Sequence, residues 1–267
     1  MNATKTTNLS ITLATDELWF LMSQFGPAYI IGMENPHLGW LTEEIEEVDR
    51  KAVQGLAERG LIGEITEQEV EIDDALLSMV EACVHPEHSL IVYSQTEDGK
   101  GKERYIHFAQ DRIVEHIESE SNIHCLTAFE NRAALTLHLK DDLRLASKTS
   151  SSSQSFYLPE EVLLNTSRLY ADGKAQEGNA VLQKSNLYST IIQTLDNVLT
   201  EPIANSSFVV LVNQNNPNTQ HVRGFGILEG KDEFWLMCPT ERMGQPQVEF
   251  TPANAEIAHQ RFIEILP

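Results

Sequence analysis

The alternation of apolar and polar residues changes period several times along the first half of the chain. Apolar stripes at helical spacing, such as Ile45, Val48, Ala52 and Leu56, are interspersed with runs of period two, such as residues 104–109. Gly, Pro, Asp and Asn residues separate these segments. The pattern predicts, in order, a strand at 9–13, helices at 15–25 and 42–59, a short strand at 70–72, a helix at 73–85, strands at 89–94, 104–109, 112–118 and 123–129, and a helix at 131–143.

Residues at the ends of these helices support the assignment. The segment 15–17 (Thr-Asp-Glu) and Asp73 are N-cap candidates, and Gly60 fits the position just after a helix, where a positive φ is needed. Residues 131–143 also fit strand alternation, but their helical stripe favours a helix.

The second half repeats this order of elements. Helical segments follow Pro159 and cover 175–183, and a helix with Leu187, Ile191, Leu195 and Val198 on one face ends at Pro202. Four strands are then predicted at 207–213, 221–228, 233–238 and 247–251, and Pro252 opens a last helix.

Both halves therefore read as a helix, four strands and a helix, which predicts an α+β protein made of two similarly ordered halves. The Ser-rich run at 147–155 reads as a linker or loop between an N-terminal half at 1–146 and a C-terminal half at 156–267. The halves could be two domains or parts of one compact domain. Internal duplication with a pseudo-twofold axis is one explanation, and the common use of hairpins with flanking helices is another.

Charge and cysteine usage narrow the class of protein. The 267 residues contain 40 Asp and Glu against 19 Lys and Arg, a formal charge of −21, which repels phosphate backbones and anionic lipids. Residues 1–8 are polar, without the apolar run of a signal peptide, and no segment has the length of a membrane span. Three widely spaced cysteines fit reduced thiols. We therefore expect a cytoplasmic protein that binds neither nucleic acid nor membranes.

Two clusters of His and Cys residues are candidate sites of chemistry. Cys83, His85 and His88 lie close in sequence, but Cys83 belongs to an apolar stripe and no second ligand pair has zinc-site spacing, so no metal is expected. The histidines of the three strands at 104–129 could meet across a sheet face, as a hydrolase or metal-dependent enzyme would require, and one of them adjoins Cys125. These histidines are His107, His116 and His124. We expect no enzyme and no cofactor.

Other motifs have simpler interpretations. Gly224, Gly226 and Gly230 lie in and after a strand, where they favour a bulge or close packing over phosphate binding. The segment 41–72, containing LAERGLIG, is similar to a winged helix, which leaves an acidic regulator open as an alternative. Its helix begins with four glutamates, which would face DNA phosphates.

Six short segments are distinctive when taken together: ITLATDELWFL near the start, LAERGLIG, VEIDDALLSMVEACVHPEHSLIVYS, FYLPEEVL, VEFTPAN, and RFIEILP at the end. In these segments the chain resembles the EspG family, the cytosolic chaperones of type VII secretion. The resemblance implies a pseudo-twofold fold with a central antiparallel sheet. It also implies that the sheet and a helical bundle hold the apolar tip of a helical PE/PPE-type client.

The leading hypothesis is accordingly a non-enzymatic, EspG-like binding protein for a helical secreted client. Aromatic and Met side chains are enriched in interface cores, and those of the second set of strands, with the preceding helix stripe, are the candidate partner-binding surface. The candidates are Phe225, Trp235, Met237, Ile191 and Leu195. The commoner role of such residues is to form the core.

Overall fold

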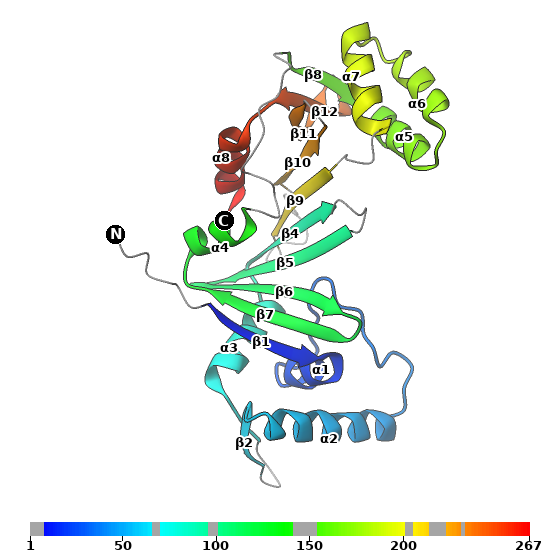
Figure 1. Ribbon diagram of the computed structural model, residues 1–267. Coiled ribbons are helices and arrows are strands. Elements are labelled where there is room, and N and C mark those ends of the chain that lie inside the picture. The colour runs from blue at the N-terminus through cyan, green and yellow to red at the C-terminus, as the bar shows by residue number, and fades with distance from the viewer. Residues whose placement is uncertain are drawn as a thin grey trace.

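A single large antiparallel sheet organises the molecule (Figure 1). The computed structural model describes residues 8–65, 70–95, 101–140, 154–200, 205–213, 223–230 and 233–267. Within these residues, ten strands form the sheet in the order β1-β7-β6-β5-β4-β9-β10-β11-β12-β8. The first five are β1 (Leu9–Ala14), β7 (Ile123–Phe129), β6 (Arg112–Glu120), β5 (Gly101–Ala109) and β4 (His88–Gln95); the others are β9 (Asn205–Asn213), β10 (Arg223–Glu229), β11 (Phe234–Arg242), β12 (Gln245–Pro252) and β8 (Phe156–Pro159).

The strand order reads the same from either edge of the sheet. Each half contributes one edge strand, β1 or β8, and four consecutive strands, β4–β7 or β9–β12. The first strand of each set of four lies at the centre of the sheet, where β4 pairs with β9 and Leu90 lies opposite Leu211. This confirms the α+β class and the similar order of the halves, which share one sheet. The division at 147–155 stays a prediction, because residues 147–153 lie outside the described ones.

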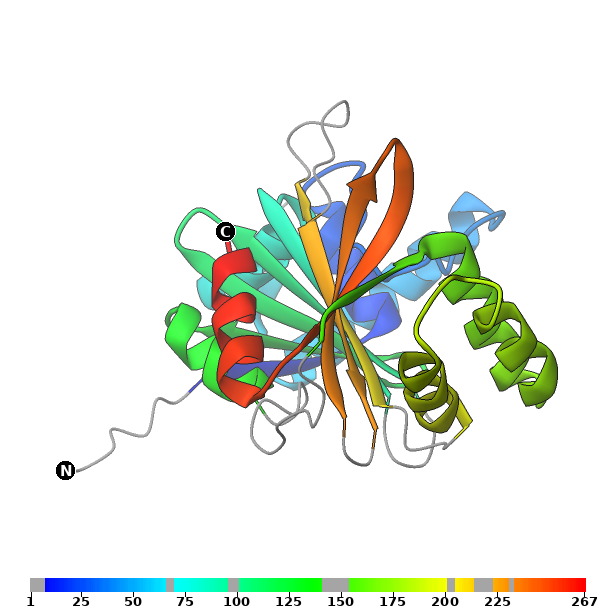
Figure 2. The same ribbon diagram turned by 90° about the horizontal axis from the view of Figure 1, so that it is seen from above.

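Helices cover both faces of the sheet. In the first half these are α1 (Thr15–Ser23), α2 (Thr42–Glu58), α3 (Asp74–Val84) and α4 (Arg132–Leu139), and in the second α5 (Glu160–Ala171), α6 (Ala175–Leu182), α7 (Ser189–Thr200) and α8 (Ala255–Ile265). A hairpin of β2 (Ile62–Ile65) and β3 (Val70–Ile72) joins α2 to α3. Figure 2 shows α4 and α8 together on one face and α5–α7 on the other.

Three apolar clusters hold these layers together. One lies under α4 and α8 and spans both halves, with Leu90 and Leu211 from the central strands and Phe262 from α8. A second packs α1, α2 and α3 against the first half, and a third packs the helices α5–α7 against the second half. We call the side that carries the second and third clusters the bundle face. Because these two clusters are separate, the bundle face carries two helical layers with the centre of the sheet between them.

Local chemistry explains most helix ends. The Asp73 carboxylate accepts a hydrogen bond from the Leu76 amide at 2.9 Å, as predicted. Gly60, with φ of +69°, ends α2, where the Leu61 amide donates to the Leu56 carbonyl at 3.0 Å. Asn131 caps α4 through the Ala134 amide. Residues 141–143 of the helix predicted at 131–143 lie outside the described residues.

Several details differ from the sequence-based predictions, among them the strand β2, which was not predicted. The cap of α1 is Ala14, whose amide donates to the Glu17 carboxylate at 2.8 Å, because the Thr15 hydroxyl contacts His124 instead. Pro252 ends β12, and α8 begins after Asn254, whose side chain accepts from the Ile257 amide. The edge strand β8 was not predicted, since its four residues are too short to show a period.

Candidate functional site

An apolar groove opens on the bundle face of the second half. Gly224 and Gly226 of β10 face this side and carry no side chain to fill the space, whereas Leu228, further along the same strand, packs into the cluster under the helices. Val210 of β9 and Met237 of β11 border the hollow, and Leu164 of α5 overhangs it. Its volume is about 760 Å³. We call it the glycine groove, lined by Glu160, Leu163, Leu164, Val210, Arg223, Gly224, Phe225, Gly226, Met237, Pro239, Val248, Arg261, Glu264 and Ile265.

Close packing of two strands explains the glycine at position 224. A Cβ atom on Gly224 would lie 2.7 Å from the carbonyl oxygen of Val209 on β9, well inside van der Waals contact. Gly230 is similar, since its Cβ would lie 2.6 Å from Cγ2 of Val198 on α7. The prediction that these two glycines permit close packing is confirmed. Because close packing requires glycine at position 224, no side chain fills the groove there.

A rigid aromatic cluster supports the wall of the groove. Phe156 of β8 stacks on Phe250 of β12 with ring centroids 4.6 Å apart, and the Trp235 ring packs edge-on against both. These three rings are at most 6% exposed. They belong to the cluster on which Leu163 of α5 packs. The position of α5, and with it the exposed Leu164, is therefore fixed by the core.

The five predicted partner-binding residues are all buried. Met237 and Phe225 line the glycine groove, the latter from the side of α8. Ile191 and Leu195 of α7 lie with Trp235 in the cluster under the helices, away from the groove lining. Contact of these five with a partner stays a prediction. Sequence reasoning missed Leu163 and Leu164, although two adjacent leucines in a short polar helix are a signal of a wide apolar face.

Charged side chains surround the apolar centre of the groove. Arg223 begins β10, Glu160 begins α5, and Arg261 and Glu264 come from α8. Residues of α8 belong to the opposite face, so the lining of the groove draws on both sides of the sheet. An apolar centre with a charged rim is the usual composition of a protein-binding surface.

The bundle face of the first half is closed by a row of buried histidines. His116 Nε2 lies 2.9 Å from His124 Nδ1, His124 Nε2 lies 3.0 Å from the Thr15 hydroxyl, and His107 Nδ1 lies 2.9 Å from the Ser89 hydroxyl. None of the three rings is more than 3% exposed. Burial lowers the pKa of His107 to about 3 and that of His116 to about 4, and it also lowers the pKa of His124.

The segment between α1 and α2 covers this row. Gly32, with φ of +84°, lies so close to the Tyr105 ring that a Cβ atom there would lie 2.2 Å from it. The Tyr105 ring in turn lies beside that of His116, with centroids 6.0 Å apart. The three histidines therefore converge, as an enzyme would require, but all three are buried.

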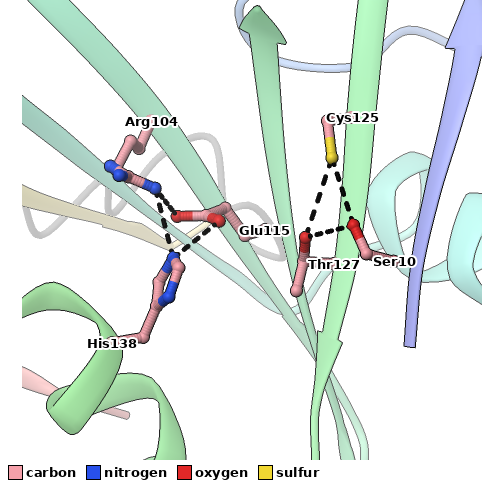
Figure 3. A network of polar contacts seen from close by, with 6 residues as sticks. All are labelled: Ser10, Arg104, Glu115, Cys125, Thr127 and His138. Carbon is pink, nitrogen blue, oxygen red and sulfur yellow. Dashed lines mark hydrogen bonds and ion pairs between the residues drawn. The ribbon is translucent and has the colours of Figure 1, made fainter. Parts of the chain in front are cut away.

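The neighbouring cysteine faces away from the histidines. Successive residues of a strand point to opposite faces, so Cys125 lies on the α4/α8 side while His124 lies on the bundle face. Cys125 Sγ is 3.2 Å from the Ser10 hydroxyl and 3.9 Å from that of Thr127 (Figure 3). The geometry excludes a Cys–His pair here.

Neither a metal-ligand cluster nor a membrane-spanning helix is found among the described residues. Cys83 is buried, and burial raises the pKa of its thiol, as expected for a core cysteine. Within the described ranges, no three His, Cys, Asp or Glu side chains are grouped as a metal ion would require. Among the same residues, no helix combines the length and apolar character needed to cross a membrane.

Comparison with known proteins finds a match in structure and none in sequence. No protein-family model matches the chain, and no curated protein matches it in sequence. A solved structure does match: the type VII secretion system chaperone EspG5 of Mycobacterium tuberculosis, in complex with the PE25–PPE41 dimer. The match covers 97% of each chain, with a TM-score of 0.65 and 10% sequence identity. The two chains share a fold. The resemblance noted from the short sequence segments is thus confirmed for the fold.

Proposed function

We propose that this protein is a non-enzymatic binding protein of the cytoplasm, an EspG-like secretion chaperone that keeps a helical PE/PPE-like client soluble. The observation that carries the proposal is the fold match over 97% of both chains with a chaperone whose structure was solved with a PE–PPE dimer. The glycine groove supports it independently, because it is an open apolar surface with a charged rim.

The glycine groove has the chemistry of a site for an apolar helix. Leu164 is 63% exposed, beside the largely covered Met237 and Val248. An apolar side chain that enters between Leu164 and the two glycines of β10 gains about 1.5–3 kcal/mol from burial. Helices that bind in grooves present such side chains at spacings of three and four residues. We therefore expect the client to be a helix with a short apolar stripe.

The acidic surface fits the role of a solubilising partner. The chain carries a formal charge of −21, and net charge of one sign opposes self-association. A client whose apolar stripe is covered by the groove gains this charge as part of the complex. The charge keeps the complex in solution without any chemical step.

The test compares two exposed leucines, one in each half of the chain. Tagged wild type, Leu164→Asp and Leu38→Asp are purified from the organism that encodes the protein, and the associated proteins are identified by mass spectrometry. Leu38, on the segment between α1 and α2, is 83% exposed and does not line the glycine groove, so both variants place a charge at an exposed position. We expect a helical secreted protein with wild type and Leu38→Asp, and its loss with Leu164→Asp. Recovery of no such protein with wild type, or its retention by Leu164→Asp, would contradict the proposal.

A further inference from the structure

A second groove lies on the opposite side of the sheet, between α4 and α8. Its volume is about 700 Å³, and its lining is mostly apolar. Leu137 of α4 is 73% exposed and Ile263 of α8 is 45% exposed, so each helix presents a large apolar side chain to solvent. We call this the α4–α8 groove, lined by Arg132, Ala133, Thr136, Leu137, Lys140, Ala255, Glu256, His259, Ile263 and Leu266.

The exposed apolar side chains of this groove are not needed for the core. Leu135 and Leu139 of α4 and Phe262 of α8 point inward and are fully buried in the cluster beneath. Leu137 and Ile263 lie on the outer sides of the same two helices. Exposed apolar side chains that contribute nothing to the core are a feature of interaction surfaces.

A buried ion network fixes the α4 wall of the groove (Figure 3). Arg104 of β5 donates to the Glu115 carboxylate of β6 at 2.6 Å, and Nε2 of His138 lies 3.0 Å from the other oxygen of that carboxylate. Arg104 is 5% exposed and Glu115 is 2% exposed. His138 therefore anchors α4 to charges inside the sheet. A wall held in this way loses little conformational entropy when a partner binds.

The charge of the groove is opposite to that of the chain. Acidic residues outnumber basic ones 40 to 19 in the whole sequence. The groove lining, in contrast, contains Arg132, Lys140 and His259 but a single acidic residue, Glu256. A basic rim on an acidic protein favours an acidic partner, and the overall charge repels nucleic acid.

We propose that the α4–α8 groove is a second docking surface, which binds a short acidic amphipathic helix of another protein. The helix lays its apolar stripe on Leu137 and Ile263 and places carboxylates beside Arg132 and Lys140. The lengths of the walls set its size: eight residues of α4 and eleven of α8 correspond to roughly 12 and 16 Å, or two to three turns. A second copy of this chain fits less well, since a symmetric contact would place the basic rims against each other.

The test uses two designed peptides of about three turns, with the same leucine stripe and with either glutamate or lysine at the other positions. Binding of each fluorescent peptide to the full chain is followed by anisotropy. We expect binding of the glutamate peptide, weakened at high salt. Leu137→Asp should lower its affinity by about tenfold or more, equivalent to ~1.4 kcal/mol. The double variant Arg132→Glu/Lys140→Glu should prefer the lysine peptide.

Two variants serve as controls. Ile257→Asp places a charge on α8 at a residue that is 45% exposed but does not line the groove, and it should leave binding unchanged. Leu164→Asp should also leave peptide binding unchanged, which separates this surface from the glycine groove. Melting followed by circular dichroism establishes that each variant is folded.

Four results would overturn the proposal. The first is that neither peptide binds, or that both bind wild type equally. The second is that Leu137→Asp binds the glutamate peptide like wild type. The third is a dimer, seen by light scattering, that Leu137→Asp dissociates, because the groove would then hold a second copy. The fourth is peptide binding that occurs only when residues 141–153 are replaced by a glycine-serine linker, because the chain itself would then fill the groove.

Discussion

The two halves of the sheet have the same strand order. On the bundle face, however, the first half is covered and the second half carries an open groove. In the first half, Tyr105 and His116 project from β5 and β6, and the segment around Gly32 covers them. In the second half, the strands in the equivalent places, β10 and β11, present Gly224 and Met237, and a groove stays open. One strand order thus gives a closed half, where a covering segment packs on large side chains, and an open half, where two glycines leave a groove.

The halves also differ in how they hold their cores. The first half buries charged and polar groups in hydrogen-bonded sets: the Arg104–Glu115–His138 network on one face and the histidine row on the other. The second half relies on stacked aromatic rings such as Phe156 and Phe250. The first half should therefore respond to loss of a polar partner and to pH, and the second half to changes of volume.

Loss of the buried carboxylate should give the largest effect. In Glu115→Ala, Arg104 remains buried without its ion-pair partner, and we expect a loss of about 3–5 kcal/mol in the free energy of unfolding measured with urea. The Arg112–Glu81 pair is a matched control, since it has the same 2.6 Å separation but both side chains are more than 40% exposed. Glu81→Ala should cost less than about 1 kcal/mol. Equal losses would show that burial does not distinguish the two pairs.

A side chain at position 224 should destabilise the second half next. Valine there would meet the Val209 carbonyl oxygen, so Gly224→Val should cost about 1–3 kcal/mol through displaced strands. It should also abolish client binding, because the new side chain occupies the groove. Gly63→Val in β2 is the control, since its Cβ would meet mainly the flexible Glu71 side chain. If Gly224→Val unfolds at the same urea concentration as wild type, the close approach of β9 and β10 is not what requires glycine.

The histidine row predicts a pH dependence that belongs to the first half. Below the ordinary pKa of about 6.5, the unfolded chain binds protons that folded His107 and His116, with pKa values of about 3 and 4, do not bind. Stability should therefore fall as the pH is lowered from 6.5, by up to ~1.4 kcal/mol per pH unit for each histidine, until the folded pKa is reached.

Urea unfolding at several pH values measures this dependence. Between pH ~6 and ~4.5, the free energy of unfolding of His107→Asn should change less steeply with pH than that of wild type, whatever the stability of the variant at neutral pH. The carboxylates titrate equally in both proteins, so the difference in slope reports the histidine. Identical slopes would mean that His107 is protonated in the folded protein.

The order of elements could be predicted from sequence, whereas the groove could not. Periodicity found the four strands and the closing helix of each half, because each run is long enough to show its period. It missed β8, which has four residues and obtains its place by pairing with β12. It also placed the start of α8 too early, because Pro252 is common at helix starts but here ends a strand.

The sites depend on register, which a single sequence does not contain. Gly224 was identified as a close-packing glycine, yet the groove exists because Val210, Met237 and Leu164 surround it from three other elements. For the histidine row, the sequence indicated only that the three rings could form a site if they met across a sheet face. The α4–α8 groove joins residues more than a hundred positions apart in the chain, and no local pattern indicates it.

The central claim, that the partner binds on the open half, has a direct test. A photoreactive amino acid replaces Leu164 above the glycine groove or Tyr29 on the segment that covers the first half; these residues are 63% and 70% exposed. Each variant is produced in the organism that encodes the protein and irradiated there, and the cross-linked peptides are sequenced. The account predicts that position 164 cross-links to an apolar helical segment of a secreted protein and that position 29 does not. Cross-links to that segment from position 29 alone, or equally from both positions, would contradict it.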